Sequence, residues 1–139
     1  MGDNAGHDSP GAQCAPVADS WIRGACLLGE VLEADRGHQL VEGLVAVSAR
    51  IPQMVAHLVE ADARANDTAR LVTAVTDAIT QRLLALAEDA LGPPPVPYAW
   101  LALGSQARQE QTAHSDQDNA LVLSDAADPD THDAYFRAL

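Results

Sequence analysis

Two acidic residues two positions apart, Asp116 and Asp118, are the side chains whose type and spacing point most directly to chemistry. If they lie on an extended strand, where side chains alternate between faces, both carboxylates point to the same side. Such a pair repels itself unless a cation lies between the two groups. Mg²⁺ is the natural occupant, because it prefers oxygen ligands and completes its shell with phosphate oxygens and water. The pair therefore predicts a Mg²⁺ site.

A Gly-Ser pair, Gly104 and Ser105, ends an apolar run of strand length and predicts a phosphate-binding turn. Glycine lets backbone N–H groups come close to a ligand, and the serine hydroxyl can add a hydrogen bond. Arg108 can supply a bidentate phosphate contact, and Glu110 is an additional candidate. An isolated Asp-x-Asp triplet or Gly-Ser turn is more often an ordinary loop. Only their order along the chain favours a nucleotide site.

The elements that must position these residues follow from apolar periodicity and from turn residues. Short strands are expected at 98–103 and 120–123, with the acidic pair leading into the second. Helices are expected at about 20–34, 40–47, 51–59 and 68–91, with Pro52 in the first turn of the third. Asn66 or Asp67 can cap the fourth helix, and Gly92 ends it. A last helix is expected to begin near Asp133.

Bulk composition excludes several classes of function. The 139 residues carry 20 acidic and only 8 basic side chains, all Arg, for a net charge of −12. Few cations are therefore offered to a polyanion, and nucleic-acid binding is not expected. The two cysteines, Cys14 and Cys26, cannot form a disulfide framework. The chain shows neither a signal peptide nor an apolar run long enough to span a membrane, so a cytoplasmic protein is expected.

The segment from Trp100 to Thr112, WLALGSQARQEQT, followed by SDQDNALVL from Ser115, resembles a known domain. It is similar to the nucleotidyltransferase-like domain found beside CBS and cyclic-nucleotide-binding modules in bacterial signalling proteins. That domain is related to the protein-PII uridylyltransferases and belongs to the polymerase-beta-type superfamily. The resemblance covers about residues 20–139 and is specific between about 92 and 123.

This resemblance implies that Gly104 and Ser105 contact nucleotide phosphates and that Asp116 and Asp118 bind catalytic Mg²⁺. The implied reaction transfers a nucleoside monophosphate from a nucleoside triphosphate to an acceptor and releases pyrophosphate. Two departures from the family pattern stand out. Ala107 occupies a position where relatives often have Gly, and the third carboxylate of the superfamily is missing. The later acidic residues are candidates by proximity alone and are not expected to replace it: Asp125, Asp128, Asp130 and Asp133.

The expected fold is α+β, with a helical region followed by the first two strands of a polymerase-beta-type sheet. Its expected divisions are a disordered tail (1–16), the helical region (17–92), a Pro-rich junction (93–97) and an incomplete nucleotidyltransferase-like domain (98–139), truncated at its C-terminus.

Two other functions remain open. The chain can be a non-catalytic module that senses nucleotide, or a helical interaction domain in which residues 20–91 bind a partner or a second copy. Other polar residues fit a solvated surface better than a site: His57 and Glu60 on the third helix, and His114 beside the acidic pair.

Overall fold

A computed structural model describes residues 39–139. The helices are α2 (Gln39–Ser48), α3 (Ile51–Glu60), α4 (Ala65–Leu91), α5 (Gly104–Ala107) and α6 (Pro129–Ala138), and the strands are β1 (Tyr98–Ala102) and β2 (Asn119–Leu123). The expected tail, the expected first helix and both cysteines lie outside the described residues. Helices followed by a two-stranded sheet confirm the α+β prediction. None of the helices between residues 39 and 139 is both long and apolar enough to cross a bilayer.

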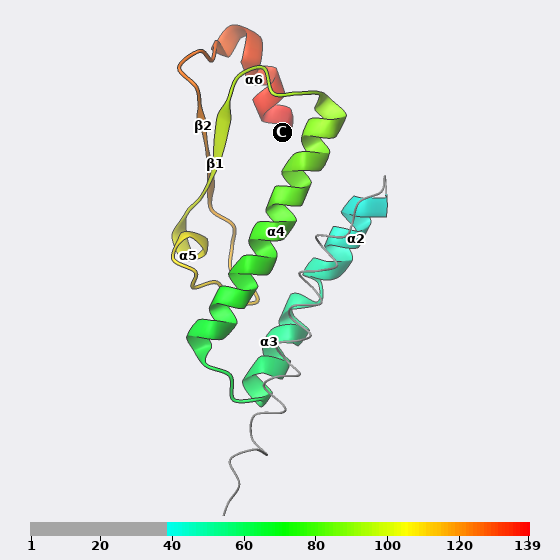
Figure 1. Ribbon diagram of the computed structural model, residues 1–139, viewed down its shortest axis with the longest axis vertical. Helices are drawn as coiled ribbons and strands as arrows, with labels where there is room; N and C mark the ends of the chain where they lie inside the picture. The colour runs from blue at the N-terminus through cyan, green and yellow to red at the C-terminus, as the bar shows by residue number, and fades with distance from the viewer. Residues whose placement is uncertain (1–38) are drawn as a thin grey trace, which may run out of the picture.

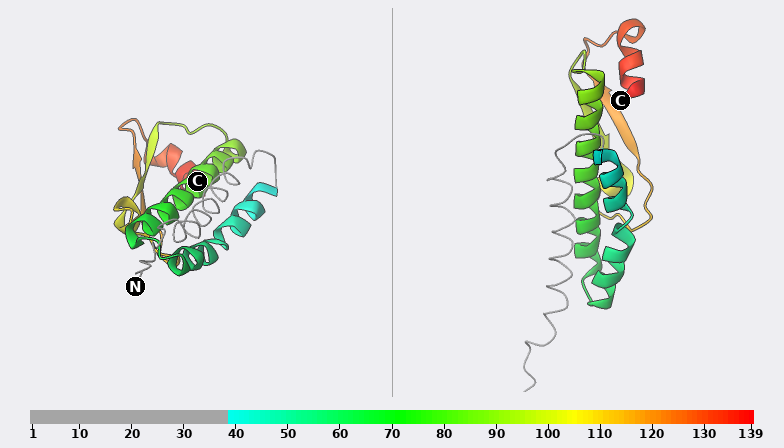
Figure 2. Two further views of the ribbon diagram at one scale, coloured as in Figure 1. Left: turned by 60° about the horizontal axis from the view of Figure 1, so that its bottom comes forward. Right: turned by 90° about the vertical axis from the view of Figure 1, so that its right-hand side faces the viewer.

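Helix α4 lies between the other two parts of the structure, with α2 and α3 along one side and the β-hairpin along the other (Figures 1 and 2). The predicted apolar stripes explain the first contact. Leu44 and Leu58, from α2 and α3, are almost completely buried against Val72 and Val75 of α4. Other predicted members of these stripes, including Val45 and Val59, are exposed, because each short helix presents only a narrow face to α4.

The beginning of α4 differs from the prediction, whereas its end agrees with it. The helix starts at Ala65, three residues before the expected Thr68. Its N-cap is Arg64, which makes no capping hydrogen bond with its side chain. The expected caps Asn66 and Asp67 therefore lie inside the first turn. At the other end, Gly92 has a φ of 87°, a conformation that favours glycine.

Strands β1 and β2 form an antiparallel hairpin in which Tyr98 pairs with Leu123 and Ala102 with Asn119. Alternate residues of β1 face α4, and the inner residue Trp100 donates a hydrogen bond from Nε1 to Asn119 Oδ1 at 3.1 Å. The opposite face exposes Leu101, Leu103 and Val122. The hairpin thus has one half-buried face and one open apolar face.

Helix α6 follows the far end of the hairpin and lies near the end of α4 (Figure 1). It runs over ten residues from Pro129, four positions earlier than expected, because the Asp128 side chain accepts a hydrogen bond from the Asp130 N–H and caps it. The Tyr135 hydroxyl donates to the Gly92 carbonyl at 2.8 Å. The Phe136 ring packs edge-on against Tyr98, with centroids 5.8 Å apart.

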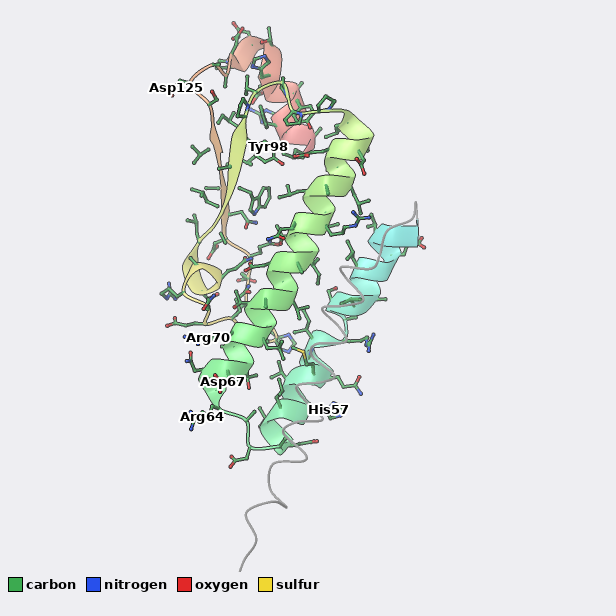
Figure 3. All side chains as sticks on the ribbon, viewed as in Figure 1. His57, Arg64, Asp67, Arg70, Tyr98 and Asp125 are labelled. Atoms are coloured by element: carbon green, nitrogen blue, oxygen red, sulfur yellow. The ribbon has the colours of Figure 1, made fainter. Side chains whose placement is uncertain are left out.

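The environment of Tyr98 leads us to expect that the protein loses stability at alkaline pH. Burial and a hydrogen bond from its hydroxyl to the Glu88 carboxylate raise the pKa of Tyr98 from 10.0 to about 12. Figure 3 shows this residue between the hairpin and α4. Because the pKa of Tyr98 is higher in the folded than in the unfolded protein, its contribution to the free energy of unfolding is fully present below about pH 10. That contribution is lost as the pH rises toward about 12. In Tyr98→Phe this part of the alkaline loss should be absent.

Denaturation midpoints between pH 8 and about 12, compared for the wild type and Tyr98→Phe, measure this contribution. Tyrosinate absorbance provides a second measurement, because the chain has only two tyrosines and the variant leaves Tyr135 alone to titrate. An identical alkaline loss of stability in both proteins would contradict the assignment.

Candidate functional site

Gly104 and Asp118 bring the end of β1 and the acidic pair together. The Leu103 N–H donates to the Asp118 carbonyl at 2.8 Å, which extends the hairpin ladder by one bond. Gly104 has a φ of 56°, and a Cβ built on it would lie 2.6 Å from Asp118 Oδ2. The Asp118 carboxylate therefore lies against the glycine backbone, in space that only glycine leaves open.

The acidic pair does not lie on the strand. Asp116 and Asp118 precede β2, which begins at Asn119, in a segment without regular structure. The prediction that strand alternation directs both carboxylates to one face is therefore wrong, because neither residue lies in a strand. Both residues are exposed, and within residues 39–139 neither carboxylate accepts a hydrogen bond or forms an ion pair. Both carboxylates therefore remain available to a cation, and that of Asp118 lies beside Gly104.

The predicted Gly-Ser turn is the first turn of a short helix, α5. No acceptor among residues 39–139 receives the backbone N–H of Gly104 or Ser105, as expected for the first residues of a helix. Ala107 does not adopt a left-handed conformation, so its backbone does not require glycine. That conformation instead occurs at Gln109, with a φ of 57°.

Helix α4 holds both halves of the candidate site through side chains outside the predicted site residues. The buried Gln106, next to Ser105, donates from Nε2 to Asp77 Oδ1 at 2.7 Å. Gln117, between the two aspartates, donates from Nε2 to Thr80 Oγ1 at 3.1 Å. One face of one helix thus fixes the glycine-containing turn and the acidic segment relative to each other.

A signal for this face is present in the sequence. Thr73, Asp77 and Thr80 recur at i, i+4 and i+7 on α4, as a polar stripe opposite the apolar residues that pack on α2 and α3. Thr73 and Thr80 are buried. A polar stripe that repeats with helical spacing opposite the apolar stripe indicates that other elements pack against both sides of the helix.

Arg108 and Glu110 pair with each other instead of pointing separately at a ligand. Arg108 Nε lies 2.8 Å from Glu110 Oε2, and both side chains are about 60% exposed, at 62% and 60%. An exposed pair of this kind contributes little to stability and separates at little cost. Arg108 can therefore leave Glu110 for a phosphate.

The later acidic residues lie at the wrong end of the hairpin to complete the site. Asp125 follows the far end of β2, as Figure 3 shows, and Asp128, Asp130 and Asp133 lie in or next to α6. No group of three or more potential metal-ligating side chains occurs within residues 39–139. His57, Glu60 and His114 therefore belong to no such cluster either. Among the described residues, no third metal-ligating side chain joins Asp116 and Asp118.

This arrangement of a strand, a glycine-containing turn and an acidic pair before the next strand is that of a nucleotidyltransferase-like domain. The family model described as "Putative nucleotidyltransferase DUF294" matches residues 49–139, and the chain belongs to this family. The matched region includes α3 and α4 together with the hairpin and α6. Neither the curated proteins nor the solved structures provide a match.

Proposed function

We propose that the domain transfers a nucleoside monophosphate from a nucleoside triphosphate to an acceptor hydroxyl, in the manner of a protein uridylyltransferase within bacterial signal transduction. The observation that carries this proposal is the contact of the Asp118 carboxylate with Gly104. It brings the proposed metal ligand to the turn where the triphosphate would lie. Family membership supports the nucleotidyltransferase class, and the sequence resemblance supports the uridylyltransferase and CBS-linked relationship.

The residues present fit Mg²⁺. Asp116 and Asp118 offer only oxygen, and Mg²⁺ is commonly held by one or two carboxylates while phosphate oxygens and water fill its remaining positions. When bound, the ion would neutralise charge on the triphosphate and align it for transfer. In the proposed reaction, the acceptor oxygen forms a bond to the α-phosphorus, the α–β phosphoanhydride bond breaks and pyrophosphate leaves.

The side chains around the pair would position this reaction. The candidate phosphate donors are the N–H groups of Gly104 and Ser105 and the Ser105 hydroxyl, at the turn against which the Asp118 carboxylate lies, and Arg108 adds a positive charge. In such a site catalysis comes mainly from alignment and electrostatics. The chain has 20 acidic side chains and only 8 basic ones, so most of its charged groups repel a triphosphate. Arg108 is therefore one of the few side chains that can attract it.

Calorimetric titration of the 139-residue chain with ATP, UTP, GTP and CTP, with Mg²⁺ and with EDTA, tests the proposal. Saturable binding that requires Mg²⁺ is expected, with UTP preferred. Binding that is unchanged in EDTA, or no binding by a folded chain, would overturn it. Nucleotide binding without pyrophosphate release in the presence of cell-extract acceptors would instead support a non-catalytic sensor.

The hydrogen bond from Gln117 to Thr80 should matter for metal binding. Replacing Thr80 with Val removes the acceptor while keeping the shape of the side chain, so the acidic segment loses one of its anchors. One hydrogen bond contributes about 0.5–1.5 kcal/mol, so Mg²⁺-dependent nucleotide binding should weaken by about 2- to 10-fold.

The matched control is Thr76→Val on the same helix. The Thr76 hydroxyl donates to the Val72 carbonyl at 3.0 Å, within α4 itself. Calorimetry should therefore give unchanged nucleotide binding for this variant. Equal weakening by both substitutions would mean that the effect comes from helix stability and not from the anchor.

A further inference from the structure

The ion pair between Arg108 and Glu110 directly follows the turn where the triphosphate is proposed to lie. From residue 92 to residue 139 the sequence has no Lys, and its two Arg residues are Arg108 and Arg137. Arg137 forms an ion pair with Asp133 within α6. Arg108 is therefore the cationic side chain that this part of the chain can offer to a phosphate at the turn.

The backbone after the turn holds Glu110 close to Arg108. Helix α5 ends in a Schellman motif: the Gln109 N–H donates to the Gln106 carbonyl at 3.0 Å, and the Glu110 N–H donates to the Ser105 carbonyl at 2.8 Å. The motif requires a left-handed residue, and Gln109 supplies it with a φ of 57°, a conformation that residues with a Cβ seldom adopt. Glu110 is thus tied by its backbone to Ser105, one of the candidate phosphate contacts.

The carboxylate of Glu110 occupies the guanidinium that a phosphate would need. Arg108 Nε donates to Glu110 Oε2 at 2.8 Å, so the free protein already satisfies this donor with an anion. The pair as a whole carries no net charge, which removes most of the attraction that Arg108 alone would exert on a triphosphate. Because the backbone keeps Glu110 two residues from Arg108, the carboxylate stays at a high effective concentration even after the pair has opened.

We propose that Glu110 is a built-in competitor of the nucleotide for Arg108, an autoinhibitory contact that lowers the affinity of the site for phosphate. This inference rests on the proposed function and gives Glu110 a role opposite to that of a ligand contact. Both side chains of the pair are well exposed, and exposed ion pairs change an equilibrium constant by at most about fivefold. The contact therefore moderates nucleotide binding without preventing it.

A double-mutant cycle tests the competition. The wild type, Glu110→Gln, Arg108→Gln and the double variant are each titrated with UTP and Mg²⁺ by calorimetry. Glu110→Gln keeps the size of the side chain and removes its charge, so UTP should bind about two- to fivefold more tightly. In the Arg108→Gln background the same substitution should change the affinity little, because no guanidinium is left to compete for. An equal gain in both backgrounds, or weaker binding by Glu110→Gln, would overturn the proposal.

The matched control is Glu60→Gln at the end of α3, which removes the same charge from an exposed glutamate outside the candidate site. Its UTP affinity should equal that of the wild type, and a gain as large as that of Glu110→Gln would mean that net charge is responsible. A wild-type chain that binds no nucleotide would contradict the proposed function itself. If the wild type binds UTP with Mg²⁺ and Glu110→Gln binds it equally well, only the competition is refuted.

Discussion

Replacing both Asp116 and Asp118 with Asn should weaken Mg²⁺-dependent nucleotide binding by at least about 100-fold. The substitution removes two negative charges and leaves side chains of almost the same shape. Mg²⁺ requires oxygen ligands and strongly favours charged ones, so an amide pair cannot replace the carboxylates. Because both residues are exposed and unpaired within the described chain, the thermal midpoint should not fall. Calorimetry with and without Mg²⁺ measures the loss.

The control for this experiment is the double variant Asp89→Asn/Asp125→Asn. It changes the net charge equally, at the end of α4 and beyond the far end of β2, where both residues are exposed. Its nucleotide binding should equal that of the wild type. If the two double variants weaken binding to the same extent, overall charge and not a specific metal site is responsible.

Gly104→Ala is expected to damage both stability and metal binding. The left-handed φ of 56° costs a residue with a Cβ about 1–2 kcal/mol. The added methyl group would also lie 2.6 Å from Asp118 Oδ2, so the carboxylate must move. Mg²⁺-dependent nucleotide binding should therefore weaken by at least about tenfold, in the range found when residues that orient a metal ligand are replaced.

Variants at two other glycines distinguish the effect of backbone strain from the effect of the contact with Asp118. Gly92 also has a positive φ, of 87°, but a Cβ there meets nothing within 4 Å, so Gly92→Ala should destabilise the fold and leave nucleotide binding intact. Gly43 lies within α2 with open space around it, and Gly43→Ala should stabilise by about 0.5–1 kcal/mol. Thermal midpoints and calorimetry on the three variants give the full comparison. Unchanged nucleotide binding in Gly104→Ala would remove the main support for the site.

The helices could be predicted from the sequence because their signals are local. Pro52 in the first turn of α3 and Gly92 at the end of α4 were placed correctly, since each residue restricts its own backbone. The start of α4 was misplaced because Asn66 and Asp67 are good capping residues in isolation. Their position inside the first turn depends on how the α3–α4 connection packs, which no local preference encodes.

Residues for the candidate site could be proposed from the sequence, but the contacts that hold them in place could not. The combination of Gly104 with the acidic pair could be recognised from order and spacing, and the structure places Gly104 against Asp118. The anchors could not be recognised in the same way. Asp77 precedes its partner Gln106 by 29 positions, and Thr80 precedes Gln117 by 37. Contacts over such distances depend on tertiary packing.

The three polar anchors on α4 have a consequence for insertions and deletions. Asp77, Thr80 and Glu88 contact Gln106, Gln117 and Tyr98, respectively, and span twelve residues, or about three helical turns. One residue inserted between Thr80 and Glu88 would rotate everything beyond it by about 100°. Glu88 would then turn away from the hairpin while the two anchors near the acidic pair stayed in place. Length changes in this helix should therefore be tolerated far less readily than substitutions on its surface.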